Sequence, residues 1–420
     1  MANPVTLGPF LGINNRLPDH KLGTEDGAYL RNAINVDLTD AGTLQRRKGY
    51  ARKILGTACH SLFELADGRA LFVDYDALFL AAAGEDGALS AVALLDGLTP
   101  GAPMSYAQVG DSVFLANGVE FWRIQGGAVL PHAVEPPQWV PMLDAVAEGS
   151  LPAGRYQVVV TYRLDDGQET APAEQVQITL TADGAVVIGG LPQAFPAGVA
   201  AAVIYMTPCN GDAFYRVASV GPGAALVSVP VLPDGDEALC STLSLRPLPP
   251  GRIVRAHMGR LLSASGPALF YSRPFSSALF DPVRDYVLFP ASVTVVEPVS
   301  GGCYVCADKT YWLAGDIEQA APVEVLPYGA AFGSGTHLRS RPGAAWWSDR
   351  GLVVAGPGGE VQVVQERAVA VTPAQTAGVL VREQGGINQA VAAARGGGSG
   401  ASVAAARSFI DAEVVRKEDR

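Results

Sequence analysis

A repeated alternation of apolar and polar positions dominates the chain. In each copy a turn glycine precedes a strand of alternating apolar residues, which a second turn joins to a strand with an aromatic or apolar pair. Apolar residues with a period of two, bounded by turn residues, predict β-hairpins. The copies cover residues 66–82, 109–124, 258–275, 301–316 and 349–364.

The spacing of these hairpins predicts a repeat architecture. Their turn glycines, Gly68, Gly110, Gly259, Gly301 and Gly351, lie 42, 149, 42 and 50 residues apart. Removing about 100 residues from the long interval leaves about 49, which restores a period of about 40 to 50, the length of a propeller blade. The sequence therefore predicts an all-β fold, with a propeller-like body of about five or six blades that one inserted domain interrupts.

The insert is expected over residues 146–246. Tyr156, Val158, Val160 and Tyr162 alternate along one face of a strand before an Asp-Asp-Gly turn, and residues 176–191 repeat the scheme. Several short strands in about 100 residues predict a β-sandwich of the immunoglobulin or fibronectin type III kind. Proline-rich segments on both sides are expected to be linkers.

The remaining boundaries follow from this insert. An N-terminal arm and the first blades are expected over 1–145, and the other blades over 247–376. The alanine- and glycine-rich segment 377–420 loses the strand pattern. Its composition predicts a flexible or helical tail, and a helix this short needs a partner surface to be stable.

Composition narrows the classes of function. Only 17% of residues are charged and 49% are hydrophobic, which is typical of a folded chain. The net charge of -11 argues against a protein that coats DNA through many phosphate contacts. The first residues show no basic run before an apolar stretch, and no apolar run is long enough to cross a bilayer, so neither a secretory signal nor a membrane span is expected.

The residues that commonly carry chemistry form no recognisable pattern. Cys303 and Cys306 have metal-ligand spacing, but no second pair completes a zinc site, and residues three apart on a strand point to opposite faces. No nucleophile elbow, phosphate loop or zinc-protease motif is present. Paired carboxylates that meet only in the fold stay open as a possibility. We predict no catalytic residues, no metal and no cofactor.

Several stretches resemble the tail nozzle or tail hub proteins of short-tailed bacteriophages. The N-terminal run GINNRLPDHKLGTEDGAYLRNAINVDLTDAGTLQRRKGY is similar to their start. GRYQVVVTYRLDDGQET and VIYMTPCNGDAFYRVASV look like their fibronectin-type insert. HMGRLLSASGPALFYSRPF, TYWLAGD and WWSDRGLVV look like their propeller hairpins.

This resemblance implies a non-enzymatic virion protein, made in the cytoplasm of the bacterial host. It would form a homo-oligomeric ring, commonly of six copies, below the portal and adaptor proteins and beside tail fibres or spikes. Double-stranded DNA would pass through the ring during ejection. Six copies would carry about six times the net charge of -11, and an acidic wall would let a polyanion slide through. The long C-terminal tail departs from the family pattern.

A basic cluster near the N-terminus stands out in this acidic chain. Our first hypothesis is that it docks on an adjacent subunit or adaptor, where arginine forms paired hydrogen bonds with carboxylates. A solvated edge strand and direct DNA contact are the alternatives. The cluster consists of Arg46, Arg47, Lys48, Arg52 and Lys53.

Two other functions compete with the ring. A virion surface protein that recognises host glycans would expose a cluster of aromatic side chains. A polysaccharide-cleaving propeller would bring two carboxylates within about 5 to 10 Å in a pocket. Trp122, Trp312, Trp346 and Trp347 lie in or near the hairpins, where they could stack on sugars or fill blade cores.

Overall fold

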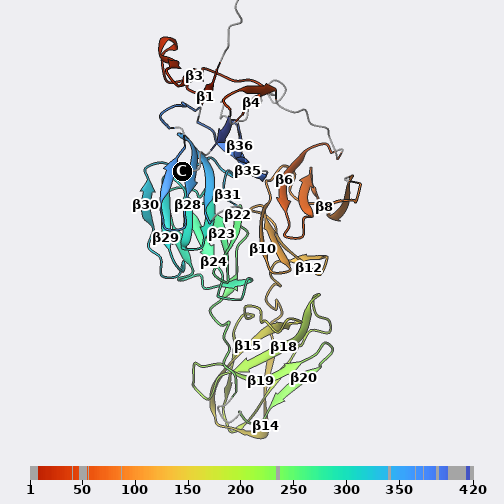
Figure 1. Ribbon diagram of the computed structural model, residues 1–420. Coiled ribbons are helices and arrows are strands. Elements are labelled where there is room, and N and C mark those ends of the chain that lie inside the picture. Colours follow the sequence, from red (N-terminus) through yellow and green to blue (C-terminus); the bar gives the residue numbers. More distant parts are fainter. Residues whose placement is uncertain are drawn as a thin grey trace, which may run out of the picture.

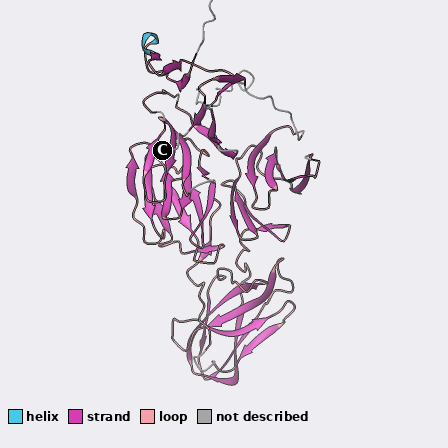
Figure 2. Ribbon diagram, viewed as in Figure 1, coloured by secondary structure: helices cyan, strands magenta, loops and turns pink. Residues whose placement is uncertain are grey.

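The protein is all-β in a computed structural model (Figures 1 and 2). The structure describes residues 8–39, 41–46, 54, 56–86, 88–232, 237–338, 342–364, 366–371, 373–384, 387–395 and 413–416. Within these residues the helical content is one short 3-10 turn, Asp19–Lys21. No helix among them has the length and apolar character needed to cross a membrane.

Five four-stranded antiparallel sheets build the body, each with its strands in chain order. We number them sheet 1 to sheet 5. Sheet 1 contains β6 (Cys59–Glu64), β7 (Ala70–Asp74), β8 (Ala77–Ala83) and β9 (Leu89–Leu95). Sheet 2 contains β10 (Ser105–Val109), β11 (Ser112–Ala116), β12 (Phe121–Gln125) and β13 (Ala128–Pro131).

The other three sheets follow the insert. Sheet 3 contains β22 (Ile253–His257), β23 (Arg260–Ser265), β24 (Ala268–Tyr271) and β26 (Tyr286–Leu288). Sheet 4 contains β27 (Val295–Val299), β28 (Gly302–Cys306), β29 (Thr310–Ala314) and β30 (Val323–Leu326). Sheet 5 contains β31 (Thr336–His337), β32 (Ala344–Ser348), β33 (Gly351–Ala355) and β34 (Val361–Val363).

All five predicted hairpins are confirmed. In sheets 1 to 4 the predicted hairpin supplies the second and third strands. In sheet 5 it supplies the third and fourth, because the short strand β31 precedes β32 on the inner side. Gly68 and Gly110 adopt φ of 84° and 57°, so the turns that open two of these hairpins use the conformation that glycine tolerates best.

The sheets stack face to face, and each apolar core lies between two successive sheets. Leu71 and Leu115 meet between sheets 1 and 2, and Phe114 and Leu261 between sheets 2 and 3. Leu262 and Val305 meet between sheets 3 and 4, and Tyr304 and Trp346 between sheets 4 and 5. This radial stacking of four-stranded sheets is the architecture of a β-propeller.

The segment expected as a flexible or helical tail instead begins with strands. β35 (Thr376–Gln384) and β36 (Ile387–Arg395) pair over nine positions, and β37 (Glu413–Arg416) pairs with β36. Ala377 and Ala392 pack on Trp347 of sheet 5, so this sheet 6 takes the next place in the stack. The prediction of a flexible or helical tail is wrong for residues 387–395, because small alanine side chains let one sheet approach another closely and packing outweighs local propensity. Residues 396–412 and 417–420 of the predicted tail lie outside the described residues.

The insert is a β-sandwich of a three-stranded and a four-stranded sheet. The first has the order β14 (Met142–Leu151), β17 (Gly184–Gly189), β20 (Leu226–Val229). The second has the order β16 (Val176–Leu180), β15 (Gly154–Leu164), β18 (Val199–Met206), β19 (Tyr215–Val220). The alternation read along β15 is confirmed, because Tyr156, Val158, Val160 and Tyr162 all enter the sandwich core.

The boundaries of the insert differ from the predicted 146–246. The sandwich begins earlier, at Met142, because that residue already pairs with Gly189 of β17. At the other end Arg246 belongs to the body, since β21 (Arg246–Pro247) pairs with β25 (Leu279–Phe280) beside sheet 3. Figure 1 shows the sandwich at one end of the molecule, attached below sheets 2 and 3.

The N-terminal arm lies at the opposite end of the body from the sandwich (Figure 1). It contains β1 (Phe10–Ile13), β2 (Gly23–Thr24) and β3 (Gly27–Leu30), followed by the hairpin of β4 (Val36–Leu38) and β5 (Leu44–Arg46). Asn15 holds the arm to the segment after sheet 5. Its side chain donates to the Ala370 carbonyl at 2.9 Å and accepts from the Ala370 amide at 2.6 Å.

Candidate assembly surface and interior polar clamps

A polar chain joins the inner strands of four successive sheets. Arg255 of β22 donates through Nη2 and Nε to Oε1 of Glu297 on β27, at 2.7 and 3.2 Å. The same guanidinium donates to Ser105 Oγ of β10 at 3.0 Å. On the other side, His337 Nε2 of β31 lies 3.4 Å from Glu297 Oε2. We call these four residues the axial clamp.

Glu297 is the centre of the axial clamp. Its side chain is fully buried, whereas the side chain of Arg255 is 21% exposed and that of His337 is 56% exposed. Gly335 lies so close to this carboxylate that a β-carbon there would collide with it. A buried carboxylate is tolerated when a paired, hydrogen-bonded cation compensates its charge, which Arg255 provides. The arrangement therefore fixes the positions of sheets relative to one another.

A second clamp joins sheets 3 and 4. Arg260 begins β23 with only 2% of its side chain exposed, and it pairs with Asp316 at 3.2 Å and with Glu318 in the loop after β29. It also donates to the Ser272 carbonyl at 3.1 Å and lies over the Tyr271 ring. Arg260 thus holds the loop that carries both carboxylates against β23.

Another close pair of carboxylates is also engaged. Asp285 is buried and accepts from the Asp281 amide at 2.8 Å. Arg273 lies 3.4 Å from Asp285, and Arg284 lies 3.2 Å from Asp281. These contacts close a loop beside sheet 3, which is a structural use of the charges.

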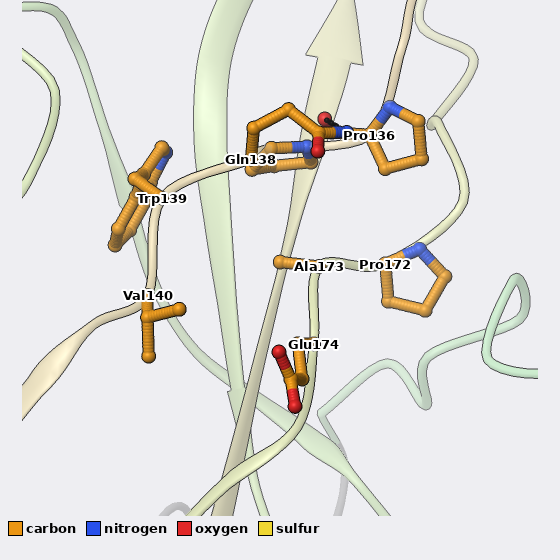
Figure 3. Close-up of a pocket in the computed structure, with 8 residues that line it drawn as sticks. Pro136, Gln138, Trp139, Val140, Pro172, Ala173 and Glu174 are labelled. Carbon is orange, nitrogen blue, oxygen red and sulfur yellow. Dashed lines mark hydrogen bonds between the residues drawn. The ribbon is translucent and has the colours of Figure 1, made fainter.

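Two adjoining pockets lie on the sandwich side of the linkers. The first holds about 200 Å³ and is lined by Pro136, Pro137, Gln138, Trp139, Val140, Pro172, Ala173 and Glu174 (Figure 3). The second holds about 430 Å³ and is lined by Val159, Pro172, Ala173, Glu174, Gln175, Leu243 and Arg246. Each of these linings contains one carboxylate, Glu174, whereas glycoside hydrolysis commonly needs two.

The cysteine pair lies in the interior, as the strand geometry implied. Cys303 faces the core between sheets 3 and 4, and Cys306 faces the core between sheets 4 and 5. Burial raises the pKa of both thiols, that of Cys306 to about 12. Among the described residues no group of three or more metal-ligating side chains comes together.

The tryptophans of the hairpins fill blade cores. Trp346 is fully buried, and Trp312 and Trp347 are 8% and 5% exposed. Tyr304 lies between two of them, with ring centroids 4.5 Å from Trp312 and 5.4 Å from Trp346. Trp122 is partly buried and packs on the core between sheets 1 and 2. These rings pack between the sheets and stabilise their stacking.

One apolar pair is presented to solvent beside the sandwich. Phe275 is 89% exposed and Met258 is 48% exposed. Their φ values of 57° and 46° are rare for bulky residues. The Phe275 amide donates to the Gly259 carbonyl at 2.8 Å, and its ring lies over Gly259. The next residue, Ser276, donates to Gln168 of the sandwich at 3.2 Å. Strained backbone that holds large apolar groups in solvent marks a candidate docking surface.

The structure shows only part of the predicted basic cluster. Arg46 ends β5 and is exposed. Arg47, Lys48, Arg52 and Lys53 lie outside the described residues, so the docking hypothesis for the five stays a prediction. Sequence reasoning missed the axial clamp and the Arg260 clamp, because their partners come from different sheets and share no local motif.

No protein-family model and no curated protein matches the chain. Among solved structures, the Pan2 WD40 domain of Neurospora crassa has 12% identity over 80% of this chain and 86% of its own, with a TM-score of 0.33. The WD40 β-propeller domain of Doa1 has 11% identity over 80% and 90%, with a TM-score of 0.30. A virginiamycin B lyase from Staphylococcus aureus has 9% identity over 80% and 92%, with a TM-score of 0.29. Similarity this low carries no functional argument, and the propeller assignment rests on the strand order of the sheets.

Proposed function

We propose that this chain is a structural subunit of a short phage tail, which assembles as a ring, commonly of six copies, and conducts DNA during ejection. The observation that carries the proposal is the order of its parts. An N-terminal arm, two propeller sheets, a sandwich and four further sheets follow one another along the chain, and the arm, the blades and the insert come in the order that the resemblance implies. The arm and the sandwich lie at opposite ends of the body, so the subunit offers two separate ends for neighbours above and below (Figure 1).

The use of charge inside the molecule supports an architectural role. The buried or half-buried arginines Arg255, Arg260 and Arg273 bind carboxylates of the same chain and so fix sheets and loops. A polysaccharide-cleaving enzyme would instead keep a pair of carboxylates open to substrate. The tryptophans Trp312, Trp346 and Trp347 are buried, so a glycan-binding surface would have to use other aromatic residues, such as the exposed Phe275.

Gold-labelled antibodies against the protein, applied to particles from the source culture and viewed by negative-stain electron microscopy, test the proposal. Label on a short tail at one vertex of the particle is the expected result. Particles that carry no label would overturn it. Native mass spectrometry of the purified protein measures ring formation separately, with closed oligomers of one size as the expected result.

The docking hypothesis for the basic cluster has its own experiment. Replacing Arg46, Arg47, Lys48, Arg52 and Lys53 by Ser should prevent assembly onto neighbouring subunits or adaptor. A matched variant that replaces only the three arginines by Lys keeps the charge but removes the paired hydrogen-bond geometry. Loss of assembly in both variants identifies docking through the arginine fork, and unchanged assembly in the Ser variant removes the hypothesis.

A further inference from the structure

His132 lies where the body continues into the sandwich. It follows β13 directly, and residues 133–141 lead from it to β14. Its amide donates to the Phe121 carbonyl at 3.0 Å, so the residue is still part of sheet 2. The residue is 4% exposed, and its ring packs on the rings of Phe121 and Phe114. Among the described residues, neither ring nitrogen has a hydrogen-bond partner of normal geometry. The imidazole therefore fills the junction as an uncharged ring.

The surroundings of this ring oppose its protonation. Burial lowers the pKa of His132 to about 3, the backbone of Ser277 acts in the opposite direction, and the positive charge of Arg123 on β12 lowers the pKa further. Arg273, in the same loop as Ser277, is bound to Asp285. No carboxylate among the described residues is therefore placed to compensate a charged ring, and a protonated His132 must reach water.

The two polar neighbours of the ring also hold the sandwich. Arg123 lies 3.7 Å from Asp166. Ser276, which precedes the serine beside the ring, donates to Gln168 at 3.2 Å. Both partners belong to the turn after β15, residues 165–168, which we call the sandwich turn. Because these neighbours cover the ring, exposure of the ring to water and release of the sandwich turn are coupled.

The contacts that close this junction are of the weaker kinds. An ion pair longer than a hydrogen bond and a single hydrogen bond between neutral groups each contribute little to stability. The third contact is the apolar cluster of Ala171, Leu245 and Leu279, which has no titratable group and is the same at every pH. The junction can therefore open locally while the cores of the body and of the sandwich stay folded.

We propose that His132 is a proton-sensitive latch between the body and the sandwich. Its uncharged ring closes the junction at neutral pH, and in acid the charged ring leaves its site and releases the sandwich turn. This inference concerns a single chain and does not depend on the proposed function. In the open form His132 has the ordinary pKa of about 6.5, so the open form binds the proton first and gains population as the pH falls below that value. From pH 7 to pH 5 the ratio of open to closed molecules should rise about 25-fold.

Hydrogen exchange of the full chain at pH 7 and pH 5, followed by mass spectrometry, tests the latch. Division of each measured rate by the intrinsic rate at the same pH gives an opening constant. The peptides that carry His132 and Ser276 should show a rise of about 25-fold. At both pH values they should also open more often than the peptide with Tyr304, which is fully buried in sheet 4 and exchanges by unfolding of the body. His132→Phe keeps the ring and has no proton to bind, so its opening constants should not change with pH.

Two glutamine variants test whether the sandwich takes part. Gln168→Ala removes the contact with Ser276, so the opening constant of the His132 peptide should rise about 2- to 10-fold at both pH values. Gln175→Ala is the matched control, because Gln175 donates to Gln157 within the sandwich, and it should leave the opening constant unchanged.

Three results would overturn the latch. The same rise with pH in His132→Phe would assign it to other groups. Equal opening constants for the His132 and Tyr304 peptides would mean that the ring is exposed only when the whole body unfolds. An unchanged opening constant in Gln168→Ala would mean that the ring is exposed without release of the sandwich turn.

Discussion

The propeller-like body and the inserted sandwich hold their strands together by different means. The body divides its apolar residues into several cores between successive sheets, and it adds the axial clamp and the Arg260 clamp across them. The sandwich has a single main core in which Tyr156, Val158 and Ile204 are fully buried. Stability in the body therefore depends on every sheet being in place, whereas the sandwich can fold around its own core.

This difference predicts two unfolding transitions. Among the described residues, the contacts that join the two regions include Arg123 with Asp166, Ser276 with Gln168, and a small apolar cluster of Ala171, Leu245 and Leu279. A small interface couples domains weakly, so denaturant should unfold them one after the other. Substitutions that affect only one of the two transitions test whether the body and the sandwich unfold independently.

The largest effect is expected at the centre of the axial clamp. Glu297→Gln keeps the shape but removes the charge that compensates Arg255, and loss of one partner of a buried pair costs about 3 to 5 kcal/mol. The free energy of unfolding measured in guanidinium should fall by this amount in the body transition alone. Glu324→Gln, which breaks the exposed contact with Lys309, is the control and should leave both transitions unchanged. An equal loss in both transitions would mean that the two regions fold as one unit.

The next effect belongs to the sandwich. Ile204→Ala removes a fully buried side chain of β18 and leaves a cavity in the core, which costs about 3 kcal/mol. Only the sandwich transition, followed by denaturant titration, should move. Val176→Ala at a partly buried position on the edge of the same core is the matched control with a smaller loss. A shift of the body transition by Ile204→Ala would contradict independent folding.

The third-largest expected effect is a change with pH in the free energy of unfolding of the body, caused by protonation of His132. The imidazole ring stacks on the Phe121 ring, with 3.7 Å between the ring centroids, and it packs edge to face on the Phe114 ring. Burial lowers the pKa of His132 to about 3. The unfolded chain has the ordinary value of about 6.5, so it binds the proton first and stability falls as the pH drops below that value. Between pH 7 and pH 5 this residue should remove about 2 kcal/mol from the body transition.

His132→Phe keeps an aromatic ring against Phe121 and has no proton to bind. Denaturant titrations at pH 7 and pH 5 should show that the variant loses about 2 kcal/mol less than the natural chain over this interval. The same pH dependence in both proteins would assign the effect to other groups.

The sequence predicted those features that depend on local patterns. The period of two that predicted a strand at Tyr156 and Val158 is visible within a few residues, and it was confirmed. The same is true of the turns predicted at Gly68 and Gly110. The axial clamp was not predictable, because Arg255, Glu297 and His337 are far apart in the chain and meet only through the stacking of three sheets.

The error at residues 387–395 has the opposite cause. Alanine has the highest intrinsic helix propensity, so an alanine-rich segment taken alone favours a helix. Ala390, Ala392 and Ala394 nevertheless lie on a strand and pack against the core around Trp347 of sheet 5. Contacts with sheet 5 therefore determine that this segment is a strand, and the sequence of the segment alone does not indicate those contacts.

The smallest effect is expected at the junction of the two regions. Arg123 and Asp166 are 3.7 Å apart, which is beyond the length of a hydrogen bond, so the pair is held only loosely. A double-mutant cycle with Arg123→Gln and Asp166→Asn should give a coupling energy below about 1 kcal/mol in either transition. Ala171→Asp, which places a charge in the buried contact with Leu245 and Leu279, should separate the transitions further. A coupling energy above about 2 kcal/mol would mean that this ion pair locks the sandwich to the body, and the two regions could then no longer be treated as separately folding units.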